Sequence, residues 1–311
     1  MSAPTGTLVS RLPQRIRLNL QAIVGRAYPR VVGANREPSW IFFEAILPLL
    51  GIAAYVFIYQ AMGARQLIGV TDPGLRAQIA ANTNALIAST VLGGTMVAFW
   101  LNVLWSMASQ LYWEKEIGNL QLYMMAPMSR MALLGGMALG GMFMTSVRAV
   151  TTLVTGVVVF SVVLQMTNPF LLLAVFFVTL IALYGMGMML ASLYLLWGRE
   201  AFNLSALLEE PIFFTSGFYF PVGGFGAPQA GLLGRAVLTF ATFIPATLGL
   251  DAMRQIILPG AWGNELWVFS PEVEFGILLV LAAVFLVLAR YTLAYLEKLA
   301  RREGRLTSRH Q

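Results

Sequence analysis

Long apolar runs separated by short polar segments dominate the chain. Crossing a hydrocarbon core of roughly 30 Å requires about 20 apolar residues in a helix, and five runs meet that length. We predict these spans at Trp40–Met62, Leu86–Tyr112, Leu133–Leu164, Phe170–Trp197 and Glu272–Leu296, with a weaker sixth span at Phe202–Pro221. The pattern therefore predicts an all-α integral membrane protein with six transmembrane helices.

Ahead of the first span, apolar and basic positions recur at helical spacing. Ile16, Leu20 and Val24 share one side of a helix predicted from Leu8 to Arg36, and Arg15 falls on the opposite side. Such a pattern is typical of an amphipathic helix that lies in the membrane interface. A solvated helix packed on a soluble partner is the alternative, and both interpretations place the helix on the cytoplasmic face.

Before the last span, two apolar segments are too short to cross a membrane. Residues 230–243 and 246–258 are divided by Pro245, and each covers roughly 20 Å at the rise of an α-helix. We predict a re-entrant pair of helices on the outer side, tolerated where it packs on protein. The positions that mark this stretch are Pro221, Pro245, Asp251 and Arg254.

Composition supports a membrane protein and orients it. Apolar residues make up 58% of the chain and charged residues 11%, with a mean hydropathy of +0.75. The net charge of +6 comes from arginines that crowd both ends rather than from a nucleic-acid-binding patch. By the positive-inside tendency, we expect both termini in the cytoplasm of a multi-pass protein of the plasma membrane. The expected domains are an amphipathic helix (1–38), a permease domain (39–297) and a basic tail (298–311).

Several kinds of chemistry are excluded or disfavoured by residue usage. The chain has no cysteine, and its one histidine is His310, so thiolate sites, histidine metal sites and Ser-His triads lack their central residue. Neither Lys115 nor Lys298 belongs to a glycine-rich phosphate loop. We therefore expect no catalytic, metal or cofactor site, and no ATPase site, in this chain.

The polar segment after the second span carries a motif. Residues Trp113 to Arg130 form a short amphipathic element between two long helices, and its stretch Glu116–Pro127 is similar to the Glu-x-Gly-Thr-Leu-Glu-x-Leu-x-x-x-Pro signature of type-two ATP-binding-cassette (ABC) export permeases. Gly118, Leu120 and Pro127 fit that signature, whereas Asn119, Gln121 and Tyr123 depart from it. The residues expected to couple to an ATPase are Glu114, Glu116, Gly118, Asn119, Leu120 and Pro127.

A second stretch strengthens the resemblance. The sequence Glu210 to Pro221, followed by Leu250-Asp251-Ala-Met-Arg254, resembles the fifth span and re-entrant helices of the same family. The resemblance implies a pair of permease protomers, identical or related, around a central path in the lipid membrane. It also implies two copies of a separate ABC ATPase subunit that bind ATP and Mg²⁺ and dock on the cytoplasmic coupling helices.

Charges and small residues inside the predicted spans have two interpretations each. Arg148, Glu209 and Glu210 lie within spans, where an unpaired charge costs at least about 2.5 to 3.5 kcal/mol. We favour an ion pair between Arg148 and Glu209 or Glu210 that locks two helices; the alternative is that Arg148 lines the path and meets an anionic headgroup. For the small residues Gly136 and Gly140 we favour close helix packing over a role in gating.

The predicted function is export of a hydrophobic or amphipathic substrate, a drug or a lipid or glycolipid, driven by ATP hydrolysis in the partner subunit. A polysaccharide-exporting ABC permease is one alternative. An ion-coupled secondary transporter is another, but no convincing internal repeat is visible. An intramembrane enzyme is the third, and it lacks a plausible catalytic residue set.

Overall fold

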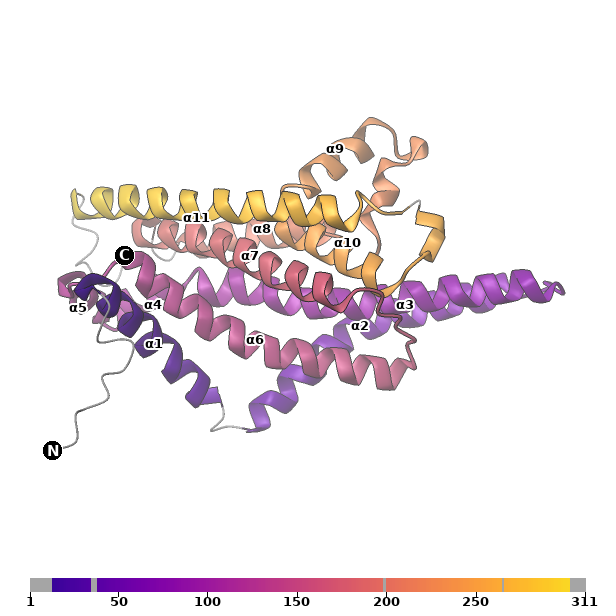
Figure 1. Ribbon diagram of the computed structural model, residues 1–311, viewed down its shortest axis with the longest axis horizontal. Helices are drawn as coiled ribbons and strands as arrows, with labels where there is room; N and C mark the ends of the chain where they lie inside the picture. Colours follow the sequence, from indigo (N-terminus) through magenta and orange to yellow (C-terminus); the bar gives the residue numbers. More distant parts are fainter. Residues whose placement is uncertain (1–12, 35–37, 198–199, 265, 303–311) are drawn as a thin grey trace.

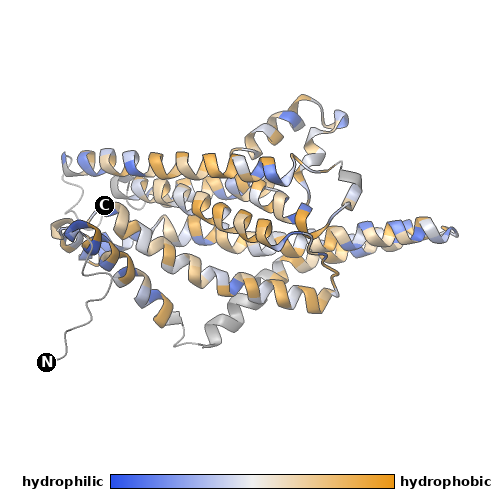
Figure 2. Ribbon diagram, viewed as in Figure 1, coloured by the Kyte–Doolittle hydropathy of each residue, from blue (hydrophilic) through white to orange (hydrophobic). Residues whose placement is uncertain are grey.

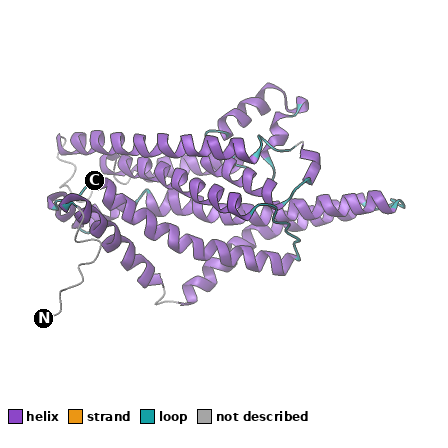
Figure 3. Cartoon of the chain, viewed as in Figure 1, coloured by secondary structure: helices purple, strands orange, loops and turns teal. Residues whose placement is uncertain are grey.

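The described chain is built of helices (Figures 1 and 3). The computed structural model describes residues 13–34, 38–197, 200–264 and 266–302, and these ranges contain no strand. In chain order the elements are α1 (Gln14–Ala34), α2 (Pro38–Gln66), α3 (Pro73–Leu101), a π-helix (Asn102–Met107), α4 (Gln110–Glu116), α5 (Asn119–Met125), α6 (Arg130–Phe160), α7 (Pro169–Trp197), α8 (Ala201–Thr215), α9 (Gly231–Ala241), α10 (Pro245–Ile257) and α11 (Pro271–Arg302). Short 3₁₀ turns lie at Val222–Gly226, Pro228–Ala230 and Ala261–Asn264.

Four helical stretches in the described chain are long and apolar enough to cross a membrane. They are Pro73–Glu116, Arg130–Phe160, Pro169–Tyr194 and Pro271–Ala300. The prediction of a multi-pass helical membrane protein is confirmed at this level, while the count of six spans stays a prediction. The weak sixth span coincides with α8, whose 15 residues are fewer than a simple crossing requires.

The core lies where α3, α6, α7 and α11 pack together. Helices α7 and α11 lie side by side over most of their lengths, and α10 packs against both. Trp100, Tyr184 and Tyr194 are among the largest fully buried side chains. Because these helices bury one another, outward-facing apolar side chains such as Val158 (72% exposed) are left for lipid.

Helix α1 packs along the first half of α6 through two glycines. A Cβ atom built on Gly136 would lie 2.7 Å from the Ile23 carbonyl oxygen, and one built on Gly140 would lie 3.3 Å from the Ala27 Cα atom. The packing role favoured for this small-residue pair is therefore confirmed. Val24 and other apolar residues on the opposite face of α1 stay exposed, as an interfacial helix requires.

Helices α2 and α3 form a hairpin that extends beyond the rest of the bundle (Figure 1). The continuous helical stretch Pro73–Glu116 has 44 residues, or about 66 Å at helical rise, twice the hydrocarbon thickness. Its tip is hydrophilic in Figure 2. The span predicted from Leu86 is thus corrected at its start: α3 already begins at Pro73, because Asp72 caps its first turn and α2 packs along it.

The chain bends sharply between α9 and α10, where the sequence predicts a break at Pro245. The two helices meet at 94°, and Pro245 is the first residue of α10, a position that needs no backbone donor. Helix α10 is almost wholly buried, whereas Leu232 and Leu233 of α9 are 87% and 77% exposed. Figure 1 shows α9 standing out from the bundle.

Candidate functional site

The polar connection between α3 and α6 is a pair of short helices that meet at a sharp turn. Gly118 has φ of 85°, in the left-handed region, and separates α4 from α5. The stretch Glu116–Pro127 is therefore not one continuous helix, because a residue in this conformation cannot continue a right-handed helix. We call residues 110–130 the coupling segment.

One face of the coupling segment is apolar and exposed. Ile117, Leu122 and Met125 are 64%, 61% and 76% exposed, and they lie beside the Gly118 turn or on α5. Leu120, in contrast, is 2% exposed and anchors α5 in the core. Large exposed apolar side chains of this kind are typical of surfaces that contact another protein or the membrane.

Helix α1 is tied to the coupling segment by an ion pair. The Arg26 guanidinium donates to the Glu114 carboxylate, and the Asn119 side-chain amide donates to the other oxygen of Glu114 at 3.0 Å. The Arg26 guanidinium also lies over the Tyr123 ring, 5.7 Å from its centroid. Glu114 therefore joins three elements, since α1, α4 and the start of α5 meet at its carboxylate.

A second arginine of α1 reaches the π-helix. Arg30 donates to the Ser106 hydroxyl at 2.9 Å. Burial lowers the pKa of the Arg30 guanidinium from its usual value, and the neighbouring positive charge of Arg26 lowers it further. The contact attaches α1 at a second point to the helical stretch Pro73–Glu116, which also contains Glu114.

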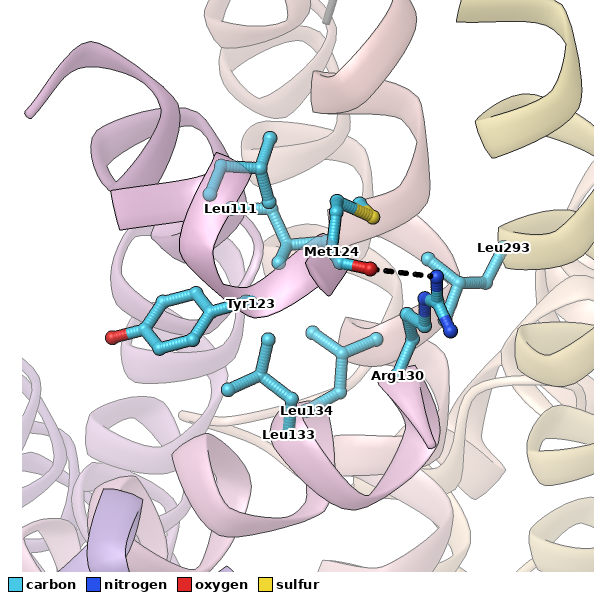
Figure 4. A pocket seen from close by; sticks show the side chains of 8 residues that line it. Leu111, Tyr123, Met124, Arg130, Leu133, Leu134 and Leu293 are labelled. Carbon is cyan, nitrogen blue, oxygen red and sulfur yellow. Dashed lines mark hydrogen bonds between the residues drawn. The ribbon is translucent and has the colours of Figure 1, made fainter. Parts of the chain in front are cut away.

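The last span is tied to the coupling segment by Arg130 (Figure 4). The Arg130 guanidinium donates to the Met124 carbonyl oxygen at 3.4 Å and pairs with the Glu297 carboxylate at 3.5 Å. A small pocket beneath α5 is lined mainly by leucines, including Leu134 and Leu293. Helix α5 is thus held against both α6 and α11 rather than being a free loop.

The remaining predicted coupling residues lie on the same segment. Glu116 ends α4 and is half-exposed, and one of its carboxylate oxygens is buried without a hydrogen-bond partner in the described part of the chain. Pro127 is exposed just after α5. The structure therefore gathers all six predicted residues into one region, with Glu114 and Leu120 inside it and Pro127 at its surface.

The predicted intramembrane charges have other neighbours. Glu209 accepts a hydrogen bond from the Trp105 indole at 2.9 Å, and Glu210 is exposed. Arg148 lies midway along α6 near Tyr184, whose hydroxyl donates to Asn102 at 2.8 Å. The ion pairs observed in the described ranges, Arg26–Glu114 and Arg130–Glu297, involve other residues, so the pairing of Arg148 with Glu209 or Glu210 stays a prediction.

Arg254 organises the opposite end of the molecule. Its buried guanidinium donates to the carbonyl oxygens of Ser89, Phe218 and Phe220 at 2.9, 3.0 and 3.3 Å. The Tyr59 hydroxyl donates to the intervening Tyr219 carbonyl at 2.9 Å. We call residues 216–221, which end at the predicted Pro221, the outer linker; its backbone is held by side chains from α2 and α10.

Asp251 ties α10 to the start of α11. Its carboxylate accepts from the Val268 backbone amide at 2.9 Å and from the Gln255 amide at 3.3 Å. Gln255 in turn donates to the Phe269 carbonyl oxygen at 2.8 Å. The predicted residues Asp251 and Arg254 therefore hold α10 in place from two sides.

Sequence reasoning missed the partners of the coupling segment. Arg26 and Arg130 were visible as charges next to apolar helices, but nothing local pairs them with Glu114 and Glu297, which lie 88 and 167 positions away. The π-helix was missed as well. One available signal was the crowding of Asn102, Ser106 and Ser109 within an otherwise apolar span.

Replacing Glu114 with glutamine should loosen α1 from the coupling segment. The neutral amide loses the ion pair with Arg26 and offers one acceptor oxygen to the two donors Arg26 and Asn119, and a hydrogen bond to a charged group is worth about 1.5–3 kcal/mol. We expect a lower melting temperature in detergent and faster proteolysis of α1. Arg17→Gln on the exposed side of α1 is the matched control; equal behaviour of both variants would contradict the anchoring role.

Comparison with known proteins returned no match, either to a family model or to a curated protein.

Proposed function

We propose that this chain is the transmembrane permease subunit of an ABC exporter. Two such protomers, identical or related, surround a path through the plasma membrane, and two separate ATPase subunits bind ATP and Mg²⁺ beneath them. The substrate is a hydrophobic or amphipathic molecule, a drug or a lipid or glycolipid. The chain contributes no ATPase site of its own.

The observation that carries this proposal is the way in which the coupling segment is attached to the long helices. An exposed apolar face on α5 offers a surface to a soluble partner, while Arg26–Glu114 and Arg130–Glu297 join the segment to α1 and α11. A force on α5 is therefore transmitted to α1, α6 and α11 at once. Interfaces of this kind transmit motion because packed elements shift as rigid bodies.

The proposal includes six spans and cytoplasmic termini. The six are α2, α3 with α4, α6, α7, α8 with the outer linker, and α11; α9 and α10 form the re-entrant pair. In support, the Asn19 side chain of α1 accepts a hydrogen bond from the Ser129 amide, and Glu297 of α11 reaches Arg130. Both ends of the described chain thus lie beside the coupling segment, as an even number of spans requires.

Replacing Gly118 with proline should abolish coupling. Proline fixes φ near −65°, far from the 85° of Gly118, and removes the amide that donates to the Lys115 carbonyl oxygen. We expect normal membrane insertion but at least a tenfold loss of ATPase stimulation when the permease is co-purified in nanodiscs with the ATPase encoded beside it. Unchanged coupled transport would remove the segment from the mechanism.

A matched control is available in the α2–α3 hairpin. Gly69 also has a positive φ, of 79°, with no neighbouring atoms around its would-be Cβ. Gly69→Pro imposes a similar local strain far from the coupling segment, so it should leave ATPase stimulation near the wild-type level. Failure of the wild-type chain to bind any ABC ATPase would sink the proposed function itself.

A further inference from the structure

A carboxylate and an indole lie together on the surface of two predicted spans. Trp105, in the π-helix, donates from its ring nitrogen to the Glu209 carboxylate on α8 at 2.9 Å. The indole is 36% exposed and Glu209 is half-buried. Glu209 is eight positions into α8, about 12 Å from the start of the helix at helical rise. In the span proposed for α8, this position lies at the depth of the acyl chains.

The position of this carboxylate needs an explanation. An ionised carboxylate accepts several hydrogen bonds, and within the described ranges Trp105 is the one donor to Glu209. A partly exposed charge at membrane depth is costly, so such residues mark pathways or ligand contacts. The unused acceptor capacity of Glu209 is therefore available to a charge that arrives from outside the chain.

Further aromatic rings lie next to Trp105. Phe202 stacks on Trp105, with ring centroids 6.4 Å apart and an interplanar angle of 22°. Phe202 also contacts Tyr112, Trp113 and Tyr194 edge to face, at 5.5, 6.3 and 5.1 Å. Trp113 is 53% exposed, so the aromatic cluster presents ring surface outward as well as inward.

Together these groups have the chemistry of a site for an organic cation. A cation is attracted to the face of an indole or phenyl ring within about 6 Å of its centroid, and a carboxylate supplies the opposite charge. A small inorganic ion would gain little from the rings, and an anionic headgroup would be repelled by Glu209. The matching ligand has a delocalised or quaternary positive charge and an apolar, preferably aromatic, body.

We propose that Glu209, Trp105 and Phe202 form a binding subsite for lipophilic organic cations. Its role as a substrate subsite rests on the proposed function, because a bound cation is a substrate only if the protein transports it. The π-helix is part of the site, since its wider turn sets the direction in which Trp105 leaves the helix. Helical segments of this kind occur frequently at functional sites.

The test is direct binding to the full chain in nanodiscs, without any ATPase. Tetraphenylphosphonium is the probe, triphenylphosphine oxide is the uncharged comparison, and empty nanodiscs report partition into lipid. We expect Glu209→Gln to weaken tetraphenylphosphonium binding at least tenfold while binding of the uncharged compound changes less than twofold. Trp105→Leu should weaken binding of both compounds.

Glu210→Gln is the matched control, since this neighbouring carboxylate is exposed. It should change tetraphenylphosphonium binding less than twofold. Equal binding by Glu209→Gln and wild type would overturn the proposal, as would an equal loss in Glu210→Gln, which would indicate general attraction to negative charge. If Glu209→Gln fails to fold, Phe202→Leu makes the same comparison: it should weaken cation binding severalfold, and unchanged binding overturns the site.

Failure of this inference is distinguishable from failure of the proposed function. Glu209-dependent binding of the cation in a chain that recruits no ATPase would support the site and remove the exporter. An ATPase complex that responds to uncharged amphiphiles, with no effect of Glu209→Gln on cation binding, would support the exporter and remove the site.

Discussion

Replacing Arg254 with methionine should be among the most destabilising single changes in this protein. The guanidinium holds the carbonyl oxygens of Ser89, Phe218 and Phe220, and it is 1% exposed. Methionine fills similar space but leaves the Phe218 and Phe220 carbonyl oxygens without this donor, whereas the Ser89 carbonyl lies inside α3. A buried acceptor left unsatisfied costs about 1–3 kcal/mol, so we expect a marked drop in melting temperature in detergent or nanodiscs.

Arg235→Met provides the comparison, because Arg235 is exposed on α9. It should melt close to the wild-type temperature. Arg254→Lys should lie between the two, since one ammonium cannot span the three carbonyl groups that a planar guanidinium reaches. A melting temperature for Arg254→Met equal to that of Arg235→Met would show that the outer linker is held by other contacts.

A single methyl group at Gly93 should have an effect of similar size. Its Cβ would lie 1.4 Å from the Phe218 carbonyl oxygen and 3.1 Å from a nitrogen of Arg254. The obstacle is backbone, so either α3 or the outer linker must move. Overpacking costs about 1–3 kcal/mol and occasionally more, and we expect Gly93→Ala to reach the upper end or beyond, measured as loss of thermal stability.

Gly276 on α11 is the natural control, because no atom lies within 4 Å of its would-be Cβ. Gly276→Ala should be neutral or slightly stabilising, since alanine favours helix by about 1 kcal/mol over glycine. The combination of Gly93→Ala with Arg254→Met should be less than additive, because both act on the Phe218 carbonyl. Strict additivity would argue that the two residues hold different parts of the chain.

Apolar periodicity located most of the helices but not their ends. The prediction Phe170–Trp197 differs from α7 by one residue, because lipid-facing and core-facing positions are both apolar there and Asn168-Pro169 marks the start. At α3 the same reasoning began 13 residues late. Polar residues there form a helix because α2 packs beside it, which no local pattern reveals.

The sequence predicts where the candidate site lies but not the contacts that hold it. Gly118 and Pro127 indicate the turns of the coupling segment, because glycine and proline have distinctive backbone conformations that depend on the residue itself. The partners of Glu114 and Glu209 are Arg26 and Trp105, and these contacts exist only after helices far apart in sequence have packed. An ion pair between Arg148 and Glu209 looked equally reasonable, because charge and depth alone do not specify which helices are neighbours.

The π-helix should be detectable in alignments of related sequences. Its Ala108 amide bonds to the Val103 carbonyl oxygen five residues earlier, so the turn contains one residue more than an α-helix would. Because the wide turn accommodates this extra residue, deleting one residue from Asn102–Met107 would close it to an ordinary α-helical turn and would change the direction in which Trp105 and Ser106 leave the helix. Descendants of an ancestor without the insertion should therefore align with a one-residue gap here.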